Sequence, residues 1–220
     1  MIEFSILCLE RWDLETELEK LIPHMDSVHL DIMDGNFVPN TAFTVAEVNK
    51  MNFDIPKHVH IMAHQPMDYI QDLETADTVT FHIEANADAM PLIEAIHAKG
   101  FGAGICINPE TPISDIKHLL PHLERVLVMA VRPGFSGQKY IPETSRKIVE
   151  LRQLDPNISI VIDGGMHEDT IREVMTLGAN ACVVCSVIVK SGGYGEKVKQ
   201  LKDSGLVGCD NRARLGSQVA

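Results

Sequence analysis

The sequence lacks the features that mark several classes of protein. Basic residues are in the minority, with 19 Lys and Arg against 31 Asp and Glu and a formal net charge of -12. Nucleic-acid backbones and anionic membranes are bound by clustered Lys and Arg, so neither is expected as a partner. No apolar run approaches the roughly 20 residues that cross a bilayer. The N-terminus has no basic region before its short apolar run, which argues against a signal peptide.

Cysteines are few and odd in number, five in all: Cys8, Cys106, Cys182, Cys185 and Cys209. Most of them lie inside apolar runs, as expected for reduced, buried thiols in a cytoplasmic protein. Cys182 and Cys185 have C-x-x-C spacing but fall on a predicted strand, where residues three apart face opposite sides. A core role is therefore favoured over a redox or zinc role.

Linkers, internal repeats and low-complexity segments are also missing. A chain of 220 residues that is 45% hydrophobic can bury a large core as one domain. We expect a single domain over residues 1–207. Residues 208–220 are polar and small and are expected to form a loose C-terminal tail.

Hydrophobic periodicity predicts eight strands that alternate with eight helices. The predicted strands cover residues 2–7, 28–33, 57–62, 78–83, 102–107, 125–131, 158–162 and 181–184. The predicted helices cover residues 13–22, 44–51, 66–73, 87–99, 113–120, 142–154, 168–177 and 195–201. Short apolar strands in this alternation are typical of a (β/α)8 TIM barrel. A doubly wound open sheet is the alternative, since periodicity does not show closure.

Polar side chains lie at the C-terminal ends of three predicted strands. His29 and Asp31 share one face of the strand over residues 28–33, which Asp34-Gly35-Asn36 ends with turn residues. His60 ends the third strand and Asp163 the seventh. In a barrel these ends meet at one mouth, where two imidazoles and two carboxylates suit a divalent cation. Any one of the four alone would more often be structural.

Two further groups fall at the same strand ends. Met33, Met62 and Met129 are spaced to face the same mouth; a single Met is usually a core filler, but three suggest an apolar cover over a reacting carbon. Three short loops could bind phosphate through backbone N–H groups. They are Gly134-Phe135-Ser136-Gly137, Gly164-Gly165 and Cys185-Ser186.

Other residues compete for these roles. His58 shares the strand phase of His60, and His82 with Glu84 repeats the alternation on the fourth strand. We interpret His58 and His82 as supporting or packing residues, although either could supply a ligand. The segment Asn108-Pro109-Glu110-Thr111-Pro112 is interpreted as a turn and helix start that could touch substrate.

Several motifs together resemble the ribulose-phosphate 3-epimerase family. The motifs are Ser5-Ile6-Leu7, His29-x-Asp31-x-Met33-Asp34-Gly35-x-Phe37-Val38-Pro39-Asn40, His60-Ile61-Met62, Asn108-Pro109-x-Thr111-Pro112, Val128-Met129, Pro133-Gly134-Phe135-Ser136-Gly137-Gln138 and Asp163-Gly164-Gly165. They run in order from the first strand to the seventh, and the resemblance extends to the eighth.

The resemblance implies a TIM-barrel enzyme that acts on a ketose phosphate with one divalent metal ion: Zn²⁺, Fe²⁺, Mn²⁺ or Co²⁺. It implies metal ligands at His29, Asp31, His60 and Asp163, with Asp31 and Asp163 also as the acid/base pair. It implies substrate contacts at Ser5, His29, His60, the three methionines and the three loops. A cytoplasmic homo-oligomer is the expected assembly.

The chemistry explains the need for two carboxylates. One removes the C3 proton beside the C2 carbonyl, and the other returns a proton from the far face of the enediolate, whose charge the cation offsets. We expect D-ribulose 5-phosphate to become D-xylulose 5-phosphate.

The sequence also departs from the family pattern, at His58, Arg132, Cys185 and the run Cys8-Leu9-Glu10. These positions leave open a 3-epimerase of another ketose phosphate, such as allulose 6-phosphate. A sugar-phosphate-binding barrel without turnover is the third hypothesis.

Overall fold

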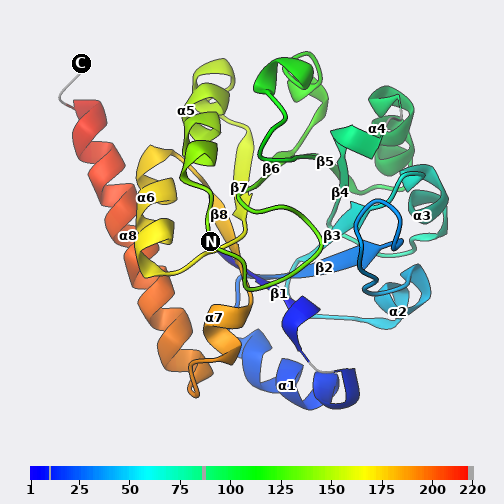
Figure 1. The fold of residues 1–220 in the computed structure, drawn as a ribbon, viewed down its shortest axis with the longest axis horizontal. Coiled ribbons are helices and arrows are strands. Elements are labelled where there is room, and N and C mark those ends of the chain that lie inside the picture. The colour runs from blue at the N-terminus through cyan, green and yellow to red at the C-terminus, as the bar shows by residue number, and fades with distance from the viewer. Residues whose placement is uncertain (10, 86–87, 218–220) are drawn as a thin grey trace.

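In the computed structural model, which describes residues 1–9, 11–85 and 88–217, eight parallel strands close into a barrel surrounded by helices (Figure 1). The strands are β1 (Ile2–Ser5), β2 (Ser27–Met33), β3 (Lys57–Met62), β4 (Thr78–His82), β5 (Gly102–Ile107), β6 (Arg125–Met129), β7 (Ser159–Asp163) and β8 (Ala181–Val184). Each pairs with the next, and β1 pairs with β8. The TIM barrel is therefore confirmed and the open sheet excluded.

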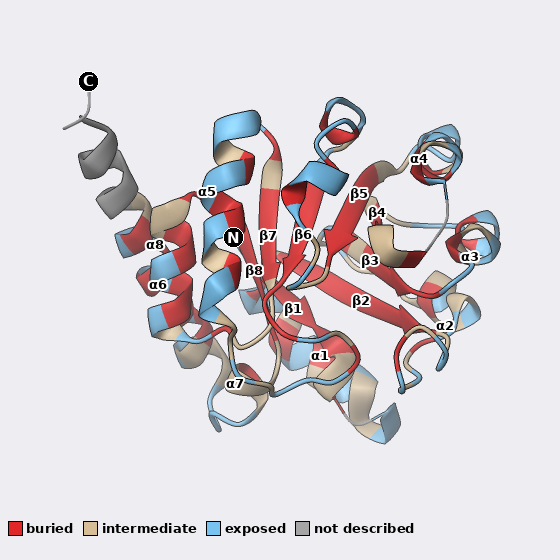
Figure 2. Cartoon of the chain, turned by 45° about the horizontal axis from the view of Figure 1, so that its top comes forward, coloured by how far each residue is buried: buried red, intermediate tan, exposed pale blue. Residues whose placement is uncertain are grey.

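The strands are the most buried part of the molecule, as Figure 2 shows. Because side chains alternate along a strand, Val28, Leu30 and Ile32 on β2 join the large apolar core that also includes helix residues. His29 and Asp31 then point the opposite way, into the barrel. Register places Asp31 beside His60 and Met129 beside Asp163. The strand pattern thus brings polar residues together at the C-terminal mouth.

Helices and their caps follow the strands. They are α1 (Leu14–Leu21), α2 (Val45–Lys50), α3 (Pro66–Asp72), α4 (Ala89–Ala98), α5 (Ser145–Leu154), α6 (Glu168–Leu177), α7 (Ser186–Val189) and α8 (Tyr194–Ser217). Thr44 and Glu47 form a capping box at the start of α2. Gly178 ends α6 in the left-handed conformation, with φ of 119°. Predicted and observed strand ends agree within two residues.

Two predicted helices were wrong in extent. The helix expected over residues 113–120 is replaced by two 3-10 turns, Ile113–Asp115 and Leu120–His122. Pro121 has no backbone N–H and cannot donate the hydrogen bond that would continue a helix. The segment therefore packs its apolar side chains without forming an α-helix. The last helix, expected to end at residue 201, continues to Ser217. The tail expected over 208–220 therefore begins as helix, and residues 218–220 lie outside the described part.

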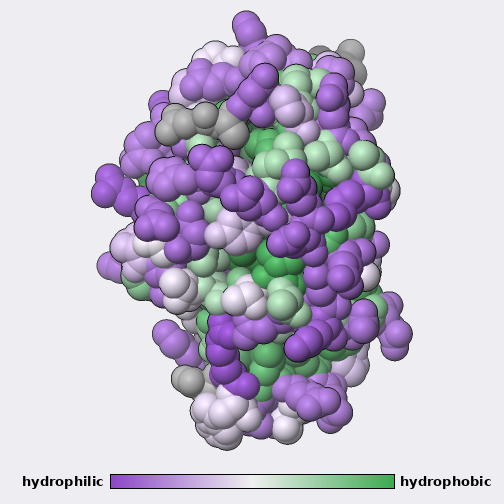
Figure 3. All heavy atoms as spheres, turned by 90° about the vertical axis from the view of Figure 1, so that its right-hand side faces the viewer, coloured by the Kyte–Doolittle hydropathy of each residue, from purple (hydrophilic) through white to green (hydrophobic). Residues whose placement is uncertain are grey.

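The surface over α2, α3 and α4 is mostly hydrophilic, with apolar atoms visible between the polar side chains (Figure 3). Among the described residues, each helix is too short or too polar to cross a membrane.

Candidate active site and metal centre

Four side chains meet at the C-terminal mouth of the barrel. His29 and Asp31 come from β2, His60 from β3 and Asp163 from β7, and one ligand atom of each lies within 4.8 Å of the others. His29 Nε2 lies 3.4 Å from Asp31 Oδ1 and 3.4 Å from His60 Nδ1. His60 Nδ1 lies 3.2 Å from the same Asp31 oxygen. His29 Nε2 lies 3.9 Å from Asp163 Oδ2.

These separations fit a metal site. Ligand atoms about 2.0–2.2 Å from one cation in a tetrahedral arrangement lie about 3.4 Å from each other. His29, Asp31 and His60 are almost fully buried, at 2%, 3% and 0% exposed, while Asp163 is partly open to the cavity. An N2O2 donor set of this kind suits Zn²⁺, Fe²⁺, Mn²⁺ and Co²⁺ alike.

The surroundings of the two carboxyl groups shift their pKa values in opposite directions. Burial opposes the ionisation of Asp31, yet His29 and His60 hold its pKa well below the usual range. Burial, together with the nearby charges of Asp31 and Glu3, raises the pKa of Asp163 to about 7. Burial alone would lower the pKa of His29, but Asp31, Glu3 and Asp163 raise it to about 10. Environments that separate two carboxyl pKa values are typical of acid/base sites.

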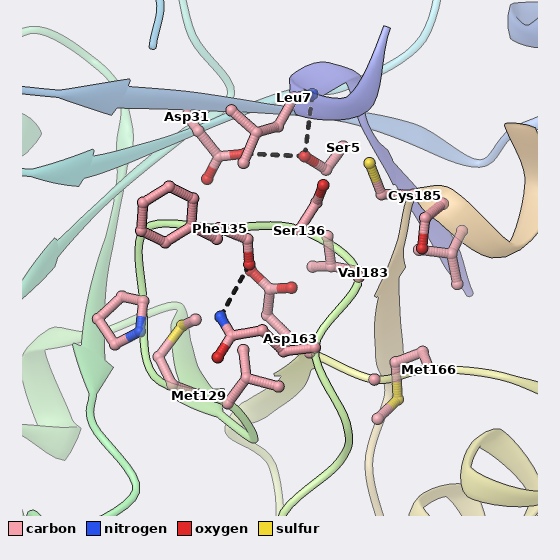
Figure 4. Close-up of a pocket in the computed structure, with 18 of the residues that line it drawn as sticks. Ser5, Leu7, Asp31, Met129, Phe135, Ser136, Asp163, Met166, Val183 and Cys185 are labelled. Carbon is pink, nitrogen blue, oxygen red and sulfur yellow. Dashed lines mark hydrogen bonds between the residues drawn. The ribbon is translucent and has the colours of Figure 1, made fainter. Parts of the chain in front are cut away.

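A cavity of about 270 Å³ opens above this cluster (Figure 4). Asp31 and Asp163 both line it, and Ser5 Oγ donates a 2.8 Å hydrogen bond to Asp31 Oδ2. The other predicted residues that line it are Met33, Met62, Met129, Gly134, Phe135, Ser136, Gly137, Gly164, Gly165, Cys185 and Ser186. His29 and His60 lie beneath the cavity and do not line it.

The glycine turn after β7 is fixed by close packing. A Cβ on Gly164 would come within 2.5 Å of Val131 Cγ2, and one on Gly165 within 2.3 Å of the Tyr140 backbone nitrogen. Both residues have positive φ, 116° and 68°. Only glycine fits here without displacing the Val131 side chain or the Tyr140 backbone, so the turn is held against the segment that follows β6.

The Gly134–Gly137 loop lies across the same mouth. Asn40, in the loop after β2, donates from Nδ2 to the Gly134 carbonyl oxygen at 2.7 Å. Gln138 donates from Nε2 to the carbonyl oxygens of Arg132 and Phe135, at 2.7 and 2.9 Å. These bonds hold the loop in shape and join it to the motif that carries Asp31.

The chain matches the model of the ribulose-phosphate 3-epimerase family over residues 1–189. A cytoplasmic ribulose-phosphate 3-epimerase isoform of Oryza sativa is 34% identical over 218 residues, 95% of each chain. The ribulose-phosphate 3-epimerases of Methanocaldococcus jannaschii and Bacillus subtilis are each 33% identical, covering 92% and 81% of this chain and 89% and 87% of theirs.

The chain belongs to the ribulose-phosphate 3-epimerase family. Members are isomerases that epimerise a carbohydrate, and this chain is such an enzyme. Solved structures support the fold alone: 3-hexulose-6-phosphate synthase from Salmonella typhimurium superposes with a TM-score of 0.67 at 14% identity, covering 93% of this chain and 98% of that one.

One departure from the family pattern changes the chemistry of the cysteines. Cys8 and Cys185 form a disulfide, which corrects the expectation of reduced thiols at these two positions. Cys106 and Cys182 are free and buried, as expected. Cys8 and Cys185 are 177 residues apart, so their spacing in the sequence did not indicate a disulfide. The Cys185 sulfur is therefore bonded to Cys8 instead of being free beside the cavity.

Arg132 does not bring its charge to the cavity. Its side chain is 80% exposed and lies 3.4 Å from Glu110 Oε1. Leu7, Met166, Gln138 and His167 line the cavity and were not predicted. Gln138 and Met166 directly follow the predicted Gly137 and Gly165, and Leu7 lies two residues after Ser5, so closeness in sequence was the available signal. His167 lies two residues after Gly165, at the N-cap position of α6.

Proposed function

We propose that this enzyme is a divalent-metal-dependent 3-epimerase that interconverts D-ribulose 5-phosphate and D-xylulose 5-phosphate. The observation that carries the proposal is that Asp31 and Asp163 line one cavity and also belong to one four-residue cluster. A cation held by His29, Asp31, His60 and Asp163 would stabilise negative charge on the C2 and C3 oxygens.

The protein's own groups would carry out the proton transfers. One of the two aspartates removes the C3 proton from one face of the sugar, and the other, protonated, returns a proton to the opposite face. Because each carboxylate serves one face, the reverse reaction uses the same pair with roles exchanged. Ser5 would orient Asp31 through its hydrogen bond. Met33, Met62 and Met129 would keep water from the reacting carbon.

The phosphate would lie over the glycine loops. The Gly134–Gly137 loop, Gly164-Gly165 and Ser186 line the same cavity, and glycine lets backbone N–H groups approach an anion. TIM barrels often bind phosphate after the seventh and eighth strands, which is where Gly164-Gly165 and Ser186 lie.

The test is turnover in deuterium oxide by protein stripped of metal and reloaded with Zn²⁺, Fe²⁺, Mn²⁺ or Co²⁺. We expect deuterium at C3 and formation of xylulose 5-phosphate from ribulose 5-phosphate, lost on stripping and regained on reloading. If deuterium exchanges at C3 only in a six-carbon ketose phosphate, such as allulose 6-phosphate, that sugar and not ribulose 5-phosphate is the substrate. Sugar-phosphate binding without exchange would overturn the enzymatic proposal.

We also propose a cytoplasmic homo-oligomer. The rice relative's name as a cytoplasmic isoform supports the location. Fractionation of cells followed by detection of the chain in each fraction tests the location, and light scattering of the purified chain tests the assembly.

A further inference from the structure

His60 uses both of its ring nitrogens. Nδ1 faces the ligand cluster, 3.2 Å from Asp31 Oδ1, and Nε2 lies 2.9 Å from His82 Nε2. His82 Nδ1 in turn lies 3.1 Å from Glu84 Oε2. His60 and His82 are 0% and 1% exposed, so these contacts exclude solvent. Glu84, His82 and His60 therefore form a continuous chain of contacts that ends at the metal ligands.

Glu84 is itself held in place. Its Oε1 accepts hydrogen bonds from the Asn108 backbone N–H at 2.7 Å and from Thr111 Oγ1. Lys147 Nζ donates to the carbonyl oxygens of Asn108 and Thr111, at 2.6 Å each. The Asn108-Pro109-x-Thr111 segment does not line the cavity. It forms the support for Glu84, whose second oxygen is left to His82.

This chain of contacts favours one arrangement of the protons and opposes the contact between His60 Nδ1 and Asp31 Oδ1, which favours the other. A carboxylate only accepts, so Glu84 takes the N–H of His82 Nδ1. The second ring nitrogen of His82, Nε2, is then the acceptor for the N–H of His60 Nε2. The lone pair of His60 is left on Nδ1, the atom that faces Asp31 and His29. The other tautomer of His60 would donate from Nδ1 to Asp31 Oδ1 and so place a hydrogen among the ligand atoms, where it would block a cation.

We propose that Glu84 and His82 are positioning residues that fix His60 in the tautomer able to bind the divalent cation. This inference rests on the proposed function, since it assumes that the cluster holds a metal. It concerns cation affinity and not the proton transfers, so it can be tested without turnover. The competing hypothesis is that His82 is itself a metal ligand, because His60, His82 and Cys106 also have ligand atoms within 4.8 Å of one another.

The experiment measures Co²⁺ and Zn²⁺ affinity and stoichiometry by chelator competition in four variants. His82→Leu removes the acceptor, and we expect affinity to fall by about 10- to 100-fold. His82→Gln can present an oxygen to His60 Nε2 and should recover part of that loss. Glu84→Gln keeps the size of the side chain but weakens the tautomer preference, and about a 10-fold loss is expected. His97→Leu is the control, since His97 is 41% exposed and pairs with Glu124 on the surface.

Nitrogen NMR of the His60 ring in the metal-free protein provides a direct readout. We expect the Nε2–H tautomer in the unmodified chain and a mixture in Glu84→Gln. Unchanged affinity in His82→Leu and Glu84→Gln, or an Nδ1–H tautomer, would overturn the proposal. So would two cations per chain falling to one in His82→Leu, because His82 would then be a ligand. If His82→Leu does not fold, His82→Gln and Glu84→Gln decide. If the variants change cation affinity and the His60 tautomer as expected but the unmodified enzyme does not turn over ribulose 5-phosphate, only the proposed function is overturned.

Discussion

Asp31 and Asp163 lie on strands that are not neighbours in the barrel, yet they share one cluster and one cavity. A residue that both binds a cation and transfers a proton has two effects when it is replaced. Loss of metal and loss of the acid or base must therefore be measured separately.

Asp31→Asn and Asp163→Asn should each lower kcat for epimerisation by about a thousandfold at equal cation occupancy. Each variant keeps one carboxylate, so it should still exchange the C3 proton of one isomer with deuterium oxide. Asp169→Asn, on α6 with an 82% exposed side chain, should be unaffected. Epimerisation within tenfold of the unmodified enzyme would contradict the two-carboxylate mechanism.

At the scale of elements, the turns between strands and helices decide the shape of the mouth. The Gly164-Gly165 turn lies against Val131 and Tyr140, so the segments after β6 and β7 fit together only where a side chain is absent. A change in this turn should affect sugar-phosphate binding before it affects the chemistry.

Gly165→Ala should raise KM for the sugar phosphate by tenfold or more and lower the free energy of unfolding by about 1–3 kcal/mol, because φ is positive and the new Cβ meets backbone. Gly193→Ala is the matched control, since a Cβ there meets no described atom within 4 Å. Kinetics and urea unfolding measure both effects. Equal behaviour of the two variants would show that the turn relaxes freely.

Helix α8 is joined to the start of β1 through Asp26. Asp26 accepts from the Ile2 N–H at 2.8 Å and from Lys202 Nζ at 2.7 Å. Burial opposes its ionisation, but Lys202 and the Ile2 amide lower its pKa. A lowered pKa means that the carboxylate stabilises the fold above its unfolded-state pKa, and that this is lost as pH falls through the folded-state value.

Asp26→Asn should therefore lower the free energy of unfolding by about 1 kcal/mol near neutral pH. The difference from the unmodified chain should shrink as pH falls below about 4, where Asp26 is protonated in the unfolded chain, and should be lost once pH passes below the lowered folded-state pKa. Urea unfolding at a series of pH values measures this. A difference that grows toward acid would contradict the assigned sign.

At the scale of the whole molecule, the Cys8–Cys185 disulfide joins the segment after β1 to the residue before α7. The first and last strands already pair in the barrel. The disulfide adds a covalent closure beside the cavity, and so it constrains both the unfolded chain and the part of the mouth that Cys185 lines.

Reduction by a dithiol should lower the free energy of unfolding by about 2–4 kcal/mol, since a long loop is released in the unfolded state. It should also raise KM for the sugar phosphate, because Cys185 lines the cavity. A Cys8→Ser, Cys185→Ser double variant should no longer respond to reductant, while Cys209→Ser should respond as the unmodified chain does. Five titratable thiols in the unreduced, unfolded protein would contradict the bond.

The amino-acid sequence alone determined the eight strands, their alternation with helices and the strand-end positions of His29, Asp31, His60 and Asp163. These features depend on local periodicity and on the rule that parallel strands share one mouth, so no long-range contact had to be known. The prediction of a helix over residues 113–120 was wrong because it was based on apolar spacing alone and did not consider Pro121.

Only the tertiary structure decided which partners these residues have. Glu3 is 0% exposed and pairs with Arg125, across 122 positions, and its other oxygen lies 3.6 Å from His29 Nδ1. Cys8 with Cys185 and Glu84 with Thr111 are also contacts between different strand ends. Such pairs depend on barrel closure and register, which bring together residues whose spacing along the chain carries no period.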